Sequence, residues 1–244
     1  MKNIFNKAMI VGLSVGLASF SSTSVAAYKE VQVADGGTIS GQVTFAGDDP
    51  APKTYFISKD NDVCGSGERK IDFVKVNDGA LTDVVVYLDK VKKGKEFPQL
   101  NTQVQQKGCE FLPFLSVMHN TGDYAAVNDD PVLHNIHTYE IIGRAKKTVF
   151  NISQPEVGTI TKSIKLKRGS AMKVECDAHD FMHSFVFVAK NPYYAVVDNS
   201  GHFSIDNVPP GKYTIKAWHG KLKEQKGKVT VSANGTVTFD FDFK

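Results

Sequence analysis

The stretch that decides how this chain is interpreted is Val174–Val188, "VECDAHDFMHSFVFV". It places Cys176, His179 and Met182 in the spacing C-x2-H-x2-M, and a further imidazole, His183, follows at once. The alternating apolar run "SFVFV" behind them is typical of a β-strand. A thiol, two imidazoles and a thioether in one short loop indicate metal ligands rather than core side chains.

The rest of the chain after Ala27 also alternates with a period of two, in runs such as "TISGQVTF", "DVVVYL", "KYTIKAW" and "TVTFDFDF". Gly, Pro, Asn and Asp bound these runs, and no long segment carries a helical stripe of apolar residues. The segment 128–131, "NDDP", is interpreted as one of the solvated turns. The pattern predicts an all-β protein of sandwich or barrel type.

Cys, His and Met are soft or borderline ligands that suit copper, and two histidines, a cysteine and a weak axial methionine define a copper site for electron transfer. The loop lacks one histidine of this set. The segment "VNDDPVLHNIHTYE" offers His134, which lies 42 residues before Cys176. Asn135 beside it would hold the two ligand loops together and donate a hydrogen bond toward the sulfur. His183 remains the alternative to Met182 as the axial ligand.

Together, "LHNIHTYE" and "CDAHDFMHSFVFV" resemble the plastocyanin and amicyanin family of cupredoxins, from about Cys109 to Ala189. The likeness to amicyanins is closest, because they share the C-x2-H-x2-M loop with a Phe before the Met, here Phe181. The resemblance implies a Greek-key cupredoxin domain with a single type 1 (blue) copper ion. The ligands that it implies are His134, Cys176, His179 and Met182.

In that family the histidine of the Cys–Met loop passes the electron through an apolar surface patch. The resemblance therefore implies an exit at His179, with Phe181 and Leu133 around it. It also implies redox protein partners, a c-type cytochrome or a periplasmic dehydrogenase. The leading hypothesis is a periplasmic carrier of single electrons, and the alternative is a copper storage or delivery protein. We expect no enzyme, since the sequence has no Ser/His/Asp order and no phosphate-binding glycine loop.

The segment 196–219, "VVDNSGHFSIDNVPPGKYTIKAWH", resembles the carboxypeptidase-regulatory-like, transthyretin-like β-sandwich family. The same family begins with strands like "GTISGQVTFAG" and "LTDVVVYL", which stand far upstream here. The economical interpretation is one sandwich, residues 28–97 plus 191–244, interrupted by a cupredoxin-like domain at 98–190. Three consecutive lobes or one fused sandwich remain alternatives.

The first 27 residues are predicted to be a secretory signal peptide, because Lys2 and Lys7 precede a short apolar stretch that ends in Val25-Ala26-Ala27. Cleavage after Ala27 would leave 217 residues and lower the formal charge from +3 to +1. This charge indicates no nucleic-acid partner and no membrane insertion. We therefore expect an exported, periplasmic protein.

The chain has three cysteines, so at least one of them is unpaired within the chain. Cys176 belongs to the metal-like loop, which leaves Cys64 and Cys109 as a candidate disulfide in an oxidising compartment. The alternative is that both are free thiols.

Overall fold

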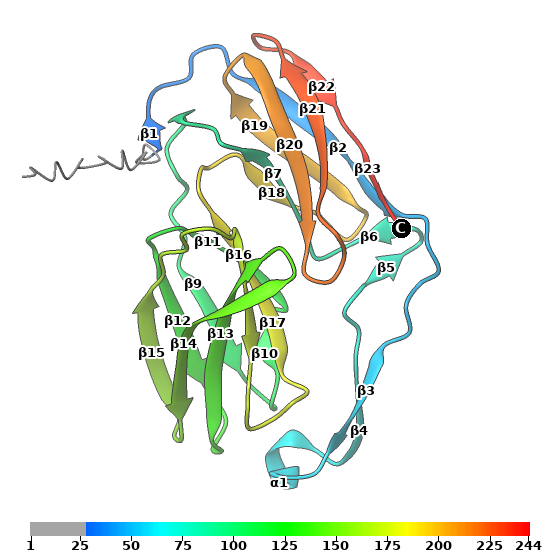
Figure 1. The fold of residues 1–244 in the computed structure, drawn as a ribbon, viewed down its shortest axis with the longest axis vertical. Helices are drawn as coiled ribbons and strands as arrows, with labels where there is room; N and C mark the ends of the chain where they lie inside the picture. Colours follow the sequence, from blue (N-terminus) through cyan, green and yellow to red (C-terminus); the bar gives the residue numbers. More distant parts are fainter. Residues whose placement is uncertain (1–27) are drawn as a thin grey trace, which may run out of the picture.

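The computed structural model describes residues 28–244, and the predicted signal peptide lies outside the described residues. The described chain is built almost entirely of strands and has a single short helix, which confirms the all-β prediction. None of its helices is long and apolar enough to cross a membrane. The strands form two lobes, one above the other in Figure 1, and a narrow arm that descends along the lower lobe.

The upper lobe, called the sandwich lobe, has two sheets that face each other across one apolar core. One sheet contains β2 (Gly37–Phe45), β5 (Val76–Asn77), β6 (Ala80–Leu81), β19 (His202–Val208), β22 (Thr236–Thr238) and β23 (Phe241–Phe243). The other contains β7 (Val84–Asp89), β18 (Tyr194–Val196), β20 (Gly211–His219) and β21 (Gln225–Val231). Alternate side chains of β2, among them Ile39 and Val43, are fully buried, as a half-buried strand requires.

The lower lobe, called the central lobe, is a second pair of sheets with its own core. One sheet has the order β11 (Leu115–His119), β17 (His183–Ala189), β16 (Ala171–Glu175), β13 (His134–Ile142) and β14 (Ala145–Gln154). The other has the order β10 (Phe111–Leu112), β9 (Thr102–Gln106), β12 (Asp123–Asn128) and β15 (Gly158–Ser163). Every predicted metal ligand lies in this lobe.

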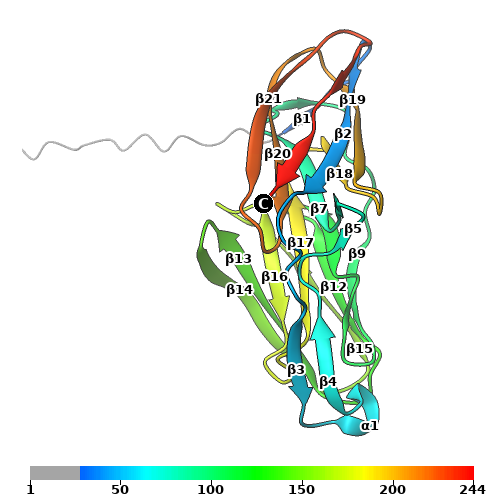
Figure 2. The same ribbon diagram turned by 90° about the vertical axis from the view of Figure 1, so that its right-hand side faces the viewer.

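The arm comprises β3 (Lys53–Ile57), the helix α1 (Asn61–Cys64) and β4 (Gly67–Ile71). β3 and β4 pair with each other and with no other strand of the described chain. Tyr55, Ile57 and Cys64 are buried in the core of the central lobe, although they fall within the predicted first part of the sandwich domain. Figure 2 shows the arm reaching the far end of the molecule. The predicted domain boundaries themselves stay a prediction.

A third apolar cluster joins the two lobes. Val85, Tyr87 and Trp218 come from the sandwich lobe, and Phe185 and Phe187 come from β17 of the central lobe. One further strand pair is parallel: β1 (Lys29–Glu30), at the start of the described chain, pairs with β8 (Lys93–Gly94). The lobes are therefore packed through aromatic side chains rather than joined only by linkers.

The buried His219 makes stability depend on pH. Burial lowers the pKa of His219 to about 4, and its Nδ1 accepts hydrogen bonds from the amides of Lys221 and Leu222. The pKa of an unfolded histidine is about 6.5, so the unfolded chain binds a proton between these values that the folded chain does not. We expect the free energy of unfolding to be highest above pH 6.5 and to fall by up to about 1.4 kcal/mol per pH unit toward pH 4 for this group.

Urea unfolding of the protein and of His219→Asn at pH 7, 6 and 5 checks this expectation. The variant should show a shallower pH dependence, and part of the slope should remain because the pKa of His183 is also lowered to about 4 by burial. Parallel slopes for the two proteins would contradict the assignment to His219.

Candidate metal centre

The candidate ligands meet at one end of the central lobe because of how its strands pair. β13 and β16 are antiparallel neighbours, with His137 opposite Glu175. The start of β13, His134, and the residue after β16, Cys176, therefore lie at the same edge of the sheet. The turn from β16 into β17 carries His179 over this edge, which brings together residues that are 45 positions apart.

Three electron-pair donors converge there, and we call His134, Cys176 and His179 the donor triad. Nδ1 of His134 lies 3.1 Å from Nδ1 of His179, and Sγ of Cys176 lies 3.8 Å from the same His179 nitrogen. All three ligand atoms are within 4.8 Å of one another, and all three residues are buried.

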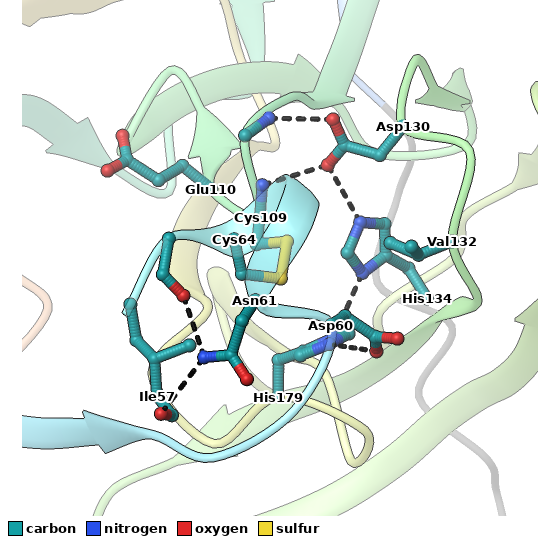
Figure 3. Close-up of a disulfide and its surroundings, with 12 residues drawn as sticks. Ile57, Asp60, Asn61, Cys64, Cys109, Glu110, Asp130, Val132, His134 and His179 are labelled. Atoms are coloured by element: carbon teal, nitrogen blue, oxygen red, sulfur yellow. Dashed lines mark hydrogen bonds and ion pairs between the residues drawn. A yellow bond between two sulfur atoms is a disulfide. The ribbon is translucent and has the colours of Figure 1, made fainter. Parts of the chain in front are cut away.

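A carboxylate fixes the tautomer of each imidazole. Nε2 of His134 donates to Asp130 Oδ2 at 2.9 Å, and Nε2 of His179 donates to Asp60 Oδ2 at 2.9 Å. Figure 3 shows this continuous series from Asp130 through both rings to Asp60. A carboxylate only accepts, so each Nε2 carries the proton and each Nδ1 of a neutral ring presents a lone pair. When both rings are neutral, the two Nδ1 lone pairs therefore face each other across 3.1 Å.

The electrostatics of the site favour a neutral His179 ring and an ionised Asp130 carboxylate. Burial lowers the pKa of His179, and the hydrogen bond to Asp60 opposes this effect without reversing it. Burial by itself would raise the pKa of Asp130, yet the backbone amide of Cys109, the bond from His134 and the amide of Gly108 hold it below its ordinary value. Asp130 therefore stays an ionised acceptor for the Nε2 hydrogen of His134.

The sulfur of Cys176 has one close donor. The backbone amide of Asn135 donates to Sγ at 3.4 Å, and the Asn135 side-chain oxygen accepts from the amides of Asp177 at 2.6 Å and Ala178 at 3.3 Å. Asn135 thus links the start of β13 to the loop after β16. Burial raises the pKa of the Cys176 thiol, so a bound cation must displace its proton.

The two candidates for an axial ligand differ in their surroundings. Met182 is fully buried in the core of the central lobe, and its amide donates to the carbonyl of His179 at 3.0 Å. Nε2 of His183 is hydrogen-bonded to the Tyr55 hydroxyl at 2.8 Å, and His183 belongs to none of the metal-competent groups in residues 28–244. His137 contacts Asp177 on the outer face of β13, away from the triad.

Cys64 of the arm and Cys109 of the central lobe form a disulfide. Their sulfurs and a ring nitrogen of His179 all lie within 4.8 Å of one another. Figure 3 shows the disulfide beside the imidazoles of His134 and His179. Cys176 is the free cysteine of the described chain and is buried.

The three residues of the predicted exit patch differ in their exposure. His179 and Phe181 are buried, whereas Leu133 is 45% exposed. The reason is the arm, which covers both side chains: Asp60 bonds the edge of the His179 ring, and the Arg69 guanidinium lies 4.9 Å above the Phe181 ring. The sequence of the ligand loop does not indicate that the arm, which is distant in sequence, packs on it.

Sequence reasoning missed both carboxylates. The "NDDP" segment is not a solvated turn throughout, because Asp130 is buried and bonds His134, Gly108 and Cys109. An acid four residues before a candidate ligand is a local signal that could have found it. Asp60 offers no such signal, since 119 residues separate it from His179.

The donor triad fits a bound soft or borderline cation. Atoms that share one ion at roughly 2.0–2.3 Å lie about 3–4 Å apart, as the 3.1 Å and 3.8 Å separations do. Two imidazoles and a thiolate are donor chemistry that suits copper.

A family model described as "Polysaccharide lyase family 4, domain II" matches residues 167–239. No curated protein matches the chain. Solved structures similar to it include a novel purple cupredoxin from Nitrosopumilus maritimus, with 16% identity over 36% of this chain and 100% of that chain and a TM-score of 0.31.

Two further solved structures are similar to the chain. Amicyanin from Paracoccus versutus has 13% identity over 43% of this chain and 97% of that chain, with a TM-score of 0.31. The Cu-containing nitrite reductase from Thermus scotoductus SA-01 has 15% identity over 39% of this chain, with a TM-score of 0.31. The chain spans 24% of that reductase.

Proposed function

We propose that this protein binds a single copper ion and passes single electrons, with His134, Cys176 and His179 as the equatorial ligands and Met182 as the axial ligand. One observation carries the proposal. Two imidazole lone pairs, 3.1 Å apart and each fixed by a carboxylate, face each other beside a buried thiol. Burying such donors without a partner for their lone pairs is costly, and a bound cation would be that partner.

Burial of the ligands supports electron transfer over catalysis. His134, Cys176, His179 and Met182 are all buried, and four protein ligands leave no open position for a substrate. A copper ion held by these ligands supplies a one-electron couple. The chain's part is to hold the donors in one arrangement: the strands fix His134 and Cys176, and the carboxylates fix the rings. We therefore propose that the protein is not an enzyme.

The surroundings of the proposed carrier follow from the sequence. The signal-peptide pattern before Ala27 supports export to the periplasm, where a c-type cytochrome or a dehydrogenase would exchange electrons with it. The sandwich lobe would be the carboxypeptidase-regulatory-like module that carries the copper lobe. A storage or delivery protein would use the same donor types but would need a site that exchanges metal readily, which a buried triad does not favour.

The visible spectrum of the purified mature protein titrated with Cu(II) tests this proposal. We expect an intense thiolate-to-copper band that bleaches on reduction and returns on oxidation. Met182→Leu keeps the side-chain volume and removes the thioether, so the band should shift. Met118→Leu is the matched control, because Met118 is equally buried in the same core and should leave the band in place.

The remaining outcomes separate the alternatives. Tight copper binding without the band would favour storage or delivery, and no binding at all would refute copper as the cofactor. A band that is indifferent to Met182→Leu would exclude the proposed axial ligand and retain the equatorial set.

A further inference from the structure

The arm closes over the imidazole that cupredoxin-like proteins are expected to expose. The side chain of His179 has no exposed surface, whereas the side chain of Asp60, which bonds its Nε2, is 37% exposed. The outermost group at this edge of the centre is therefore a carboxylate from a distant part of the chain.

The arm is attached firmly enough to fix that carboxylate. Cys64 is bonded to Cys109, and the Tyr55 hydroxyl is hydrogen-bonded to His183 at 2.8 Å. Arg69 donates to three backbone carbonyls, those of Gly108 at 3.1 Å, Cys109 at 2.7 Å and Cys64 at 2.6 Å. The anchoring residues lie before Asp60 in the sequence (Tyr55) and after it (Cys64 and Arg69).

The backbone at Asp60 is also unusual. Its φ of 52° and ψ of 38° place it in the left-handed region, which glycine adopts without cost and which aspartate and asparagine tolerate better than other residues. An aspartate is held here in a less favourable backbone conformation with its carboxylate directed at His179. Asp62, two residues on, is exposed and has no such contact.

We propose that Asp60 is a positioning residue of the copper centre, which orients His179 through Nε2 and lowers the reduction potential of the bound ion. This inference rests on the proposed function. A carboxylate on the distal nitrogen fixes the tautomer and ring orientation and makes the ligating nitrogen more basic. A more basic ligand and a nearby negative charge stabilise the doubly charged oxidised ion more than the singly charged reduced ion.

Two variants test the role without disturbing the backbone. Asp60→Asn keeps an acceptor oxygen and removes the charge, and Asp60→Gly removes the side chain at a position whose backbone angles suit glycine. Asp62→Asn is the matched control, since it removes a charge of the same kind two residues along, in the first turn of α1, without touching His179.

The metal-free protein gives the first measurement. Nitrogen NMR of the imidazoles should show His179 with its proton on Nε2 and slow exchange of that proton with water. We expect Asp60→Gly to speed this exchange at least tenfold or to mix the tautomers, and Asp62→Asn to leave both unchanged. An unaltered His179 signal in Asp60→Gly would overturn the positioning role even if no copper binds.

The copper-loaded protein gives the second measurement, the midpoint potential by redox titration of the visible band. We expect it to rise in Asp60→Asn and to rise further in Asp60→Gly, with a smaller change in Asp62→Asn. A shift in Asp60→Asn no larger than that in Asp62→Asn would overturn the tuning role. Absence of the band in the parent protein would instead count against the proposed function, while the NMR result would still decide the role of Asp60.

Discussion

Replacing Cys176 with serine is expected to abolish the visible thiolate-to-copper band and the reversible one-electron couple, because no other thiol lies in the donor triad. Cys64 and Cys109 are joined in a disulfide and supply no thiolate. Serine keeps the shape of the side chain, but its hydroxyl is a hard donor with far weaker affinity for copper. The expected loss is complete for the band and at least a hundredfold for copper affinity, measured by titration against a chelator of known affinity.

The control for this variant is a change beside the ligands that leaves them intact. Ser184 on β17 is buried and its hydroxyl has no hydrogen-bond partner, so Ser184→Ala should fold, bind copper and keep the band. Circular dichroism of the metal-free proteins establishes that both variants fold. A band that survives in Cys176→Ser would show that the thiolate ligand has been misassigned.

Replacing Phe187 with alanine is expected to reduce the free energy of unfolding by about 3–5 kcal/mol, the usual range for a phenylalanine lost from a core. Phe187 is buried in the cluster between the lobes, with its ring centroid 4.8 Å from that of Tyr87 and 5.9 Å from that of Trp218. The cavity would open in the contact that joins the lobes, so their unfolding transitions should also separate.

Urea unfolding followed by Trp218 fluorescence and by circular dichroism measures both effects. Phe56→Ala is the control, because that ring is 71% exposed on β3 and its loss should change stability by less than about 0.5 kcal/mol. A loss below 1 kcal/mol for Phe187→Ala would mean that the lobes do not depend on this cluster.

Local patterns were sufficient for the strands and for the ligand loop. Alternation of apolar residues fixes which side of a strand faces the core. β2 follows this alternation, whereas β17 is buried on both faces. The C-x2-H-x2-M spacing placed Cys176 and His179 together, and the turn-rich segment before β13 supplied His134. In each case the pattern that predicts the strand or ligand lies within a few residues of it in the sequence.

The arm shows where local patterns end. Apart from Cys64, nothing within the segment 53–71 indicates that its strands pair only with each other and pack on the central lobe, since they alternate like any others. Its position is set by contacts distant in sequence: Cys64 with Cys109, Tyr55 with His183 and Asp60 with His179. The cysteine count pointed to Cys64 with Cys109, but the sequence carries no signal for Tyr55 with His183 or for Asp60 with His179. The cover over His179 was therefore not predicted.

The disulfide between the arm and the central lobe bears on how this protein is divided for expression. A gene fragment for residues 98–190 looks self-sufficient, because it encodes all four proposed ligands. It would lack Asp60, Arg69 and Tyr55, uncover His179 and Phe181, and leave Cys109 as a reactive thiol next to two imidazoles. Excision at these boundaries would therefore give the proposed ligands a third sulfur-bearing side chain beside them and an open edge, so the fragment would not reproduce the surroundings that these residues have in the full chain.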